Sequence, residues 1–335
     1  MINHVKLNRI CPKKLTSLVY LVAISVIANI NLKANTTLTS TMTTSFNKRM
    51  LTYLFAVITI SFATEATAQD VREPAKKPAE WTQPYPAFRI AGNLYYVGTY
   101  DLACYLVKTD EGLILINTGV AGSESAIKRS IESLGFSYHD IRILLTTQAH
   151  YDHVGAMAAI QKATGARVFA NAAEAGVMKD GGKSDYEMGG SSSAFVPLRV
   201  DQIIRHGDNI RLGNTAMQML HHPGHTMGSC SYLLNVKDSA RSYKVLIANM
   251  PTIISDRKFS EISGYPNIEK DFAATLSSMR NVQFDLWVAS HASQFNLHEL
   301  RKPGDAYNPL VFARHDAYMK ALEGLKAAFE KKRLQ

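Results

Sequence analysis

Residues 143–155 read ILLTTQAHYDHVG. The stretch begins with three apolar residues, a pattern typical of a strand that is covered on both faces. It then breaks into polar residues and places His150, Asp152 and His153 within four positions. A strand that runs into a tight loop directs alternate side chains into one space, and imidazole nitrogens and carboxylate oxygens are ligands that zinc prefers. The stretch therefore predicts a metal site at the end of a buried strand.

Taken alone, such a trio is more often a solvated polar loop than a set of metal ligands. Two further segments change that balance. His225 closes the segment HHPGHT at 221–226, after the strand-like run 216–220, and His291 lies in VASHAS at 288–293, after the apolar run 284–288. The whole chain has 11 histidines. Histidines at three separate strand ends favour one shared metal site over three unrelated loops.

The pattern Gln148-x-His150-x-Asp152-His153, followed by His225 and His291, resembles the metallo-β-lactamase superfamily. The usual first motif of that superfamily is His-x-His-x-Asp-His, so Gln148 stands where the first histidine belongs. Together with the sequence NMP at 249–251, this glutamine resembles the GOB-type enzymes of β-lactamase subclass B3. The resemblance runs from about residue 73 to 309 and includes segments 89–98 and 181–186. It implies an α/β fold, an αββα sandwich of two mixed sheets flanked by helices, with the site along one edge.

The resemblance also implies a zinc-dependent hydrolase that opens the ring of penicillins, cephalosporins and carbapenems by attack of metal-bound hydroxide, and so gives antibiotic resistance. It assigns Gln148, His150 and His225 to one Zn²⁺, and Asp152, His153 and His291 to a second. Asp152 would be the catalytic residue, both as a ligand and in orienting the attacking water. The neutral carboxamide oxygen of Gln148 is a weaker donor to zinc than an imidazole nitrogen. We therefore expect the site of Asp152, His153 and His291 to bind zinc more tightly.

Seven further residues are weaker candidates for supporting a ligand or contacting the substrate, and each has an ordinary structural alternative. Asn117 is placed at a strand end where most of the superfamily has aspartate, so it could support a ligand histidine or simply form a turn. Met250 replaces the serine of many relatives in the subclass, or is a core methionine. Tyr186 and Thr252, with the loop residues Lys183 and Ser184, are candidates for the substrate carboxylate. His222 is expected to pack or to support a ligand.

The charge of the chain lies mostly in its first 68 residues. The formal net charge is +9, from 37 Lys and Arg against 28 Asp and Glu. Residues 1–68 hold seven of the basic residues and one acid, which leaves the remainder with a net charge of +3. This is weak support for a nucleic-acid partner. We expect a small-molecule substrate, no nucleic acid, and a monomer.

The first 68 residues contain two apolar stretches, 15–30 and 51–62. The second follows Lys48-Arg49 and precedes Ala66-x-Ala68, which is the pattern of a secretory signal peptide. We expect cleavage after Ala68, a single domain over 69–335, no stable membrane span in the mature protein, and a periplasmic location. Two signals in tandem suggest that Met42 or Met50 is the working start. The alternative is a retained anchor at 15–30, which is short for a spanning helix.

The mature chain is expected to alternate strands and helices. We predict strands at 93–100, 103–107, 113–117 and 167–170, a strand-rich half at 202–249, helices at 156–162, 269–279 and 310–332, and a loop at 181–194. Ser123 could cap another helix that stops at Gly135. Cys104 and Cys230 lie in strand-like sequence, where two small buried side chains are the simpler interpretation and a disulfide stays open.

Three other functions compete. A thioesterase of glyoxalase type or a lactonase would share the metal motif, but these enzymes commonly use a bridging aspartate between the last two histidines. That interval offers only poor matches here, such as Asn249. A nuclease of the superfamily would need a basic groove or an added domain. A non-catalytic zinc-binding protein would show no hydrolysis with zinc present.

Overall fold

Strand β4 (Leu113–Ile116) shows how the apolar runs become central strands. All four of its side chains are buried. Leu113 and Leu115 pack in a core shared with helices, whereas Ile114 and Ile116 pack in a core shared with a second sheet. Because side chains alternate across a strand, a continuous apolar run fits only a strand with both faces covered. This is the αββα arrangement that the sequence predicted.

The computed structural model describes residues 71–335, which fall in one compact unit and contain two sheets. The first sheet has seven strands in sequence order: β1 (Phe88–Ala91), β2 (Leu94–Tyr96), β3 (Tyr105–Lys108), β4, β5 (Ile141–Leu145), β6 (Arg167–Ala170) and β7 (Gln202–Ile203). The second sheet has the order β12 (Leu286–Ala289), β11 (Ser242–Ala248), β10 (Cys230–Lys237), β9 (Thr215–His221) and β8 (Asn209–Leu212). Strands β4 to β7 are parallel, as are β11 and β12, so both sheets are mixed.

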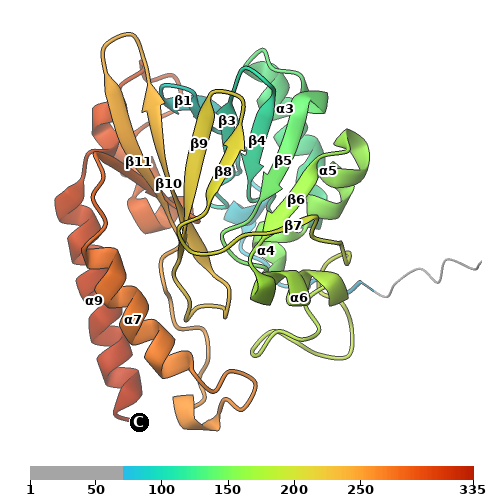
Figure 1. Ribbon diagram of the computed structural model, residues 1–335, viewed down its shortest axis with the longest axis vertical. Coiled ribbons are helices and arrows are strands. Elements are labelled where there is room, and N and C mark those ends of the chain that lie inside the picture. Colours follow the sequence, from blue (N-terminus) through green and yellow to red (C-terminus); the bar gives the residue numbers. More distant parts are fainter. Residues whose placement is uncertain (1–70) are drawn as a thin grey trace, which may run out of the picture. The chain divides into compact units, whose positions relative to one another are not determined.

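Helices cover the outer side of each sheet (Figure 1). On the side of the first sheet lie α3 (Glu124–Ser133), α5 (Met157–Thr164) and α6 (Ala172–Asp180), and on the side of the second lie α7 (Ile268–Arg280) and α9 (His315–Arg333). Two single-turn helices, α4 (Tyr151–Val154) and α8 (Leu297–Leu300), lie in loops. The expected fold class is confirmed.

The expected helix at 310–332 is two elements. Residues Pro309–Phe312 form a separate 3-10 turn, which the side chain of Asn308 caps by accepting from the backbone N–H of Leu310. The α-helix begins at His315, after Arg314, whose φ of −108° and ψ of 68° are not helical. The carbonyl of Arg314 accepts a hydrogen bond of 2.9 Å from the indole N–H of Trp287 on β12. This tertiary contact fixes the break.

Ser123 makes no side-chain capping bond, contrary to expectation. It ends a 3-10 turn, Ala121–Ser123, and its own backbone is already helical at φ −78° and ψ −15°. A capping side chain needs an extended backbone to reach back to the next N–H groups. Gly135 is confirmed as the stop, with a left-handed φ of 81°.

Cys104 and Cys230 are free and fully buried, so the simpler interpretation of the two thiols holds. The expectations about the signal peptide and the start of the mature chain concern residues outside the described part. Within 71–335, no helix combines the length and the apolar character needed to cross a bilayer.

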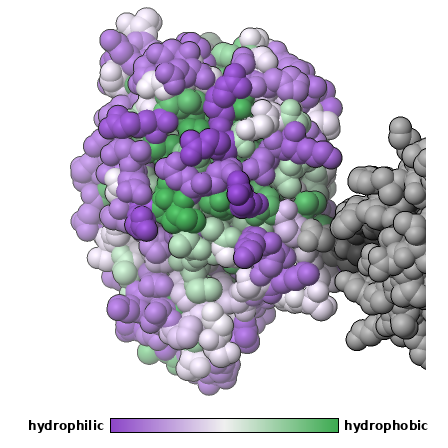
Figure 2. Space-filling model, turned by 45° about the vertical axis from the view of Figure 1, so that its right-hand side comes forward, coloured by the Kyte–Doolittle hydropathy of each residue, from purple (hydrophilic) through white to green (hydrophobic). Residues whose placement is uncertain are grey.

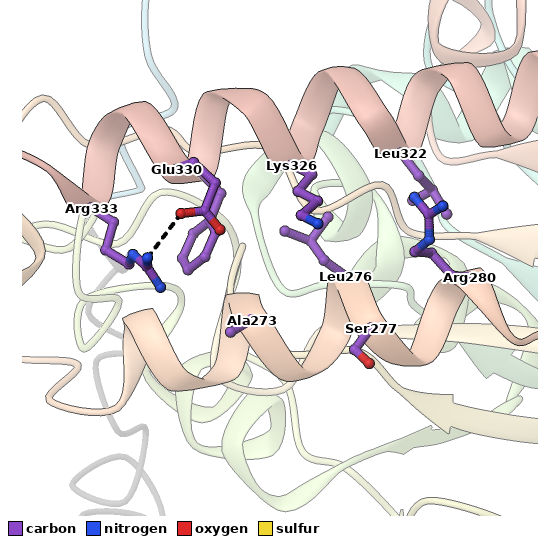
Figure 3. Close-up of a pocket in the computed structure, with 9 residues that line it drawn as sticks. Ala273, Leu276, Ser277, Arg280, Leu322, Lys326, Glu330 and Arg333 are labelled. Carbon is purple, nitrogen blue, oxygen red and sulfur yellow. Dashed lines mark ion pairs between the residues drawn. The ribbon is translucent and has the colours of Figure 1, made fainter.

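Large exposed hydrophobic side chains are few on the described part of the chain: Met188, Val196, Ile203, Tyr307, Leu310 and Leu334. On the face that Figure 2 presents, hydrophobic residues gather near the middle and hydrophilic residues surround them. Helices α7 and α9 lie side by side, and a groove between them is lined by Leu276, Leu322 and the cations Arg280, Lys326 and Arg333 (Figure 3). None of the sequence-predicted site residues lines this groove.

Candidate metal centre

The predicted ligands lie on loops that leave the ends of strands. Residues 146–153 follow β5, residues 222–229 join β9 to β10, and His291 lies two residues after β12. Thr147 joins the three loops. Its carbonyl accepts from the N–H of Cys230 at 2.8 Å, and its hydroxyl accepts from the Ser290 hydroxyl at 2.9 Å. The two sheets therefore bring together loops that are distant in the sequence, at one edge of the sandwich.

Asp152, His153 and His291 form a group whose ligand atoms all lie within 4.8 Å of one another. Asp152 Oδ2 is 3.2 Å from His153 Nε2 and 3.4 Å from His291 Nε2. Ligands at 2.0–2.1 Å from a tetrahedral zinc lie about 3.3 Å apart, so these separations fit one ion. His153 Nε2 is buried and has no partner with hydrogen-bond geometry, although the carboxylate is near. The three residues fit Zn²⁺, as the sequence predicted.

His291 is held from behind by Asp101. Asp101 Oδ2 lies 3.0 Å from His291 Nδ1, and Asp101 Oδ1 accepts from the N–H of Ser293 at 3.0 Å. The backbone of the two segments is also paired, because the Ala292 N–H donates to the Asp101 carbonyl and Leu102 forms a β-bridge with His291. A proton on Nδ1, donated to this carboxylate, leaves the Nε2 lone pair on the side of Asp152, where it would be available to hold Zn²⁺.

The second predicted set, Gln148, His150 and His225, is also buried together. The rings of His150 and His225 lie 5.0 Å apart, centroid to centroid. His225 Nδ1 is 2.8 Å from the carbonyl of Thr252, and His150 Nε2 is 3.2 Å from Asp185 Oδ2. Each ring therefore has its other nitrogen left for an ion. Gln148 Oε1 is buried without any hydrogen-bond partner, an arrangement that suits a metal ligand.

Burial and charge act in opposite directions on these side chains. Burial alone would raise the pKa of Asp152, but His153 and His291 hold it well below its usual range. Burial opposes charge on His291, yet Asp101 and Asp152 raise its pKa to about 9. Burial lowers the pKa of His225 to about 3, and His150 adds to that effect. The centre thus combines an ionised aspartate with a neutral His225, which are the states that bind zinc.

Comparison with known proteins agrees with this geometry. The profile of the Metallo-beta-lactamase superfamily matches residues 99–238. The class B3 di-zinc metallo-beta-lactamase LRA-12 from an Alaskan soil metagenome is 56% identical, with a TM-score of 0.78 over 78% of this chain and 99% of that chain. The metallo-beta-lactamase GOB-18 from Elizabethkingia meningoseptica is 54% identical, with a TM-score of 0.79 over 79% and 98%. The chain belongs to the class B3 metallo-β-lactamases.

More distant relatives of this class B3 chain include other hydrolases. BJP-1, a subclass B3 metallo-beta-lactamase of Bradyrhizobium japonicum, is 30% identical, with a TM-score of 0.71 over 76% of this chain and 96% of that one. Hydroxyacylglutathione hydrolases of two Bradyrhizobium strains, ORS 278 and BTAi1, are 32% identical over 123 residues and 31% identical over 143. These matches cover 35% and 40% of this chain, and the chain spans 40% and 48% of the two curated relatives.

The weaker candidates of this metallo-β-lactamase take different places. Thr252 contacts His225 through its carbonyl and, at 3.0 Å, through its hydroxyl. Tyr186 donates from its hydroxyl to the His225 carbonyl at 3.1 Å. Met250 is buried in the core between the sheets. His222 is fully buried, with Nδ1 2.8 Å from the Ser231 hydroxyl. Thr252 and Tyr186 thus support a ligand, whereas Met250 and His222 pack.

Asn117 supports the ligand loop rather than a histidine ring. It is buried with a left-handed φ of 62°, which asparagine tolerates better than most residues. Its side-chain oxygen accepts from the N–H of Thr147 at 2.9 Å and from the hydroxyls of Thr147 and Thr146 at 3.2 and 3.3 Å. It therefore fixes the start of the loop that carries Gln148, His150 and Asp152.

Four residues with a place at the centre had not been predicted from the sequence. Asp101, Glu174 and Asp185 are acids far from the motif in the chain, and only the fold brings them near it. The ring of Trp81 lies 5.9 Å from those of both Tyr151 and His291. The one available signal was that Asp185 lies in the predicted loop 181–194, next to Lys183, Ser184 and Tyr186, which were candidates for contacting the substrate.

Proposed function

We propose that this chain is a zinc-dependent β-lactam hydrolase that opens the ring of penicillins, cephalosporins and carbapenems. The observation that carries the proposal is the meeting of Asp152, His153 and His291 in one ligand group. The 56% identity with a class B3 di-zinc metallo-beta-lactamase, over nearly all of that chain, supports the same activity.

The chemistry divides between the ion and the protein. When bound, zinc supplies a nucleophile at neutral pH, because it lowers the pKa of bound water far below its value in bulk, to about 7. Asp152 directs Oδ2 towards His153 and His291, and we assign its Oδ1 to orienting the attacking water. Asp101 and Asp185 hold the rings of His291 and His150, so the ligands need not reorganise during the reaction.

The substrate carboxylate needs a cation or a hydroxyl group beside the centre. We propose Lys183 and Ser184 for this role, because they adjoin Asp185, which contacts His150. Trp81 supports the proposal from another side, as an apolar wall next to His291 and Tyr151. Thr252 and Tyr186 are better explained as supports of His225.

Hydrolysis of a carbapenem by the purified protein tests the proposal. We expect turnover with Zn²⁺, its loss with a chelator, and its return when Zn²⁺ is added back. Asp152→Ala should lose most of the activity, whereas Asp140→Asn, at a half-exposed surface position, should keep it. Absence of turnover by folded, zinc-loaded wild-type protein would refute the proposal.

A thioesterase is the second candidate, because two curated hydroxyacylglutathione hydrolases match 35% and 40% of the chain. The residues argue against it. Asn249 occupies the interval where such enzymes have a bridging aspartate; its side-chain oxygen accepts from the Ser290 hydroxyl at 3.3 Å. A neutral amide cannot supply the negative charge that a shared ligand of two cations provides. We expect a glutathione thioester to be cleaved far more slowly than a carbapenem in the same assay.

We also propose that the protein is exported to the periplasm after cleavage behind Ala68. The support is the sequence of 48–68, with its basic start, short apolar stretch and small residues at 66 and 68. The N-terminal sequence of the protein recovered from the periplasm is expected to begin at Gln69. A terminus upstream of Met42 would contradict both the cleavage and the proposed start. Size-exclusion chromatography with light scattering tests the expected monomer.

A further inference from the structure

Glu174 is a buried carboxylate next to the metal centre. It lies in the first turn of α6 and is 2% exposed. Its Oε2 accepts from the N–H of Ala149 at 2.7 Å, and its Oε1 accepts from the N–H of Gly228 at 2.9 Å and from the hydroxyl of Thr226. Removing a carboxylate from water costs several kcal/mol unless hydrogen bonds compensate. The three donors explain how this fold keeps an acid here.

The three donors belong to two different ligand loops. Ala149 lies between Gln148 and His150, and Thr226 directly follows His225. Each of the predicted ligands Gln148, His150 and His225 is therefore one residue away from a group that hydrogen-bonds to Glu174. The group of Asp152, His153 and His291 is held by different contacts. Asp101 fixes the ring of His291, and the hydroxyl and N–H of Thr118 both donate to the His153 carbonyl.

The packing around Glu174 leaves little room for the loops to shift. A Cβ atom on Gly228 would lie 2.6 Å from Glu174 Cγ and 2.3 Å from Asn171 Oδ1, so only glycine allows this approach. Asn171 in turn caps α6 by accepting from the N–H groups of Ala173 and Glu174 at 2.9 and 3.1 Å. The carboxylate is thus fixed by its own helix on one side and by two loops on the other.

We propose that Glu174 is a positioning residue that holds the loop of Gln148 and His150 at a fixed separation from His225. It thereby sets the affinity of these three ligands for their metal ion and leaves the site of Asp152, His153 and His291 unchanged. The proposal rests on the proposed function only in taking both sites to bind divalent cations. Gln148 offers a weak donor, so this site depends more on a preformed geometry than one with three strong donors.

Titration of metal-free protein with Co²⁺, followed by absorption spectroscopy, tests the proposal. Glu174→Gln keeps the shape but places an amide N–H against at least one of the donors. We expect the first equivalent to bind within twofold of wild type and the second to bind about 10- to 100-fold more weakly. Thr226→Val keeps the carboxylate and removes one donor, and should weaken the second equivalent by about three- to tenfold.

Tyr318→Phe is the matched control, because it removes a buried hydrogen bond of 2.9 Å to the Met279 carbonyl, between α9 and α7. It should lower the melting temperature and leave the affinities for the first and second Co²⁺ unchanged.

Three results would overturn the proposal. Folded Glu174→Gln could bind the second Co²⁺ as tightly as wild type, it could bind both ions equally more weakly, or the wild type could bind no second Co²⁺. Should Glu174→Gln fail to fold, Thr226→Val decides. Carbapenem hydrolysis by the wild type is measured in a separate assay. A failure of the proposed hydrolase function can therefore be told apart from a failure of the proposed role of Glu174.

Discussion

Replacement of Asp101 by alanine should weaken the Asp152–His153–His291 site. Asp101 is the carboxylate that accepts from His291 Nδ1 at 3.0 Å, while His291 Nε2 faces Asp152 Oδ2 at 3.4 Å. With Asp101 present, the neutral ring carries its proton on Nδ1 and offers Nε2 to the ion. Without it, the other tautomer and other ring orientations become accessible, and the ring is free to turn away.

The size of the effect follows from two opposing contributions. Loss of such an outer partner costs about 10- to 100-fold in metal affinity, or about 1.4–2.7 kcal/mol. In the other direction, Asp101 helps to raise the His291 pKa to about 9 in the metal-free protein. At pH 7 a proton therefore competes with the metal, and removing Asp101 relieves part of that competition. At pH 9 the proton weakens zinc binding by the wild type only about twofold. The zinc affinity measured at pH 9 therefore reports almost entirely the loss of the Asp101 hydrogen bond.

The assay is competition for Zn²⁺ between metal-free protein and a chromophoric chelator, at pH 9 and pH 7. We expect Asp101→Ala to bind its first Zn²⁺ about 10- to 100-fold more weakly at pH 9, with a smaller loss at pH 7. Asp101→Asn retains an acceptor and should fall between wild type and Asp101→Ala. Asp140→Asn, a half-exposed acid paired with Arg142, is the control. Binding by Asp101→Ala within twofold of wild type at pH 9 would refute the reasoning.

Three further predictions follow from single residues. Gly228→Ala should lower the free energy of unfolding by about 1–3 kcal/mol in urea denaturation, because its Cβ would lie 2.3 Å from Asn171 Oδ1; an unchanged midpoint would contradict this. Burial, with His206 and His221, lowers the His222 pKa to about 3, so between pH 6.5 and 3 only the unfolded chain takes up that proton. Stability should therefore fall with falling pH by up to about 1.4 kcal/mol per unit, and more steeply than in His222→Gln; parallel profiles would exclude the effect. Gln148→His should tighten binding of the second Co²⁺ at least about tenfold, since imidazole is the better donor; calorimetry showing no gain would mean that the ring cannot reach the ion.

Several features of the fold could be predicted because they depend on local pattern. The run at 113–116 is apolar at every position and becomes a strand buried on both faces. The predicted strand at 167–170 has the observed bounds of β6. Where prediction was wrong, a tertiary contact or a local backbone angle decided the outcome. Trp287 fixes the break before His315, and the helical backbone of Ser123 removes its capping role.

The sequence by itself determined the chemistry of the ligands, because residue type and strand-end position settle which donors are present. His150, Asp152, His153, His225 and His291 were predicted as ligands from their strand-end positions and from the family motif that they resemble, and the structure groups Asp152, His153 and His291. Only the tertiary structure decided what holds those donors in place. Asp101 lies 190 residues from His291, Asp185 lies 35 residues from His150, and Glu174 lies 25 residues from Ala149. No local pattern encodes such contacts, since they exist only once two sheets bring their loops to one edge.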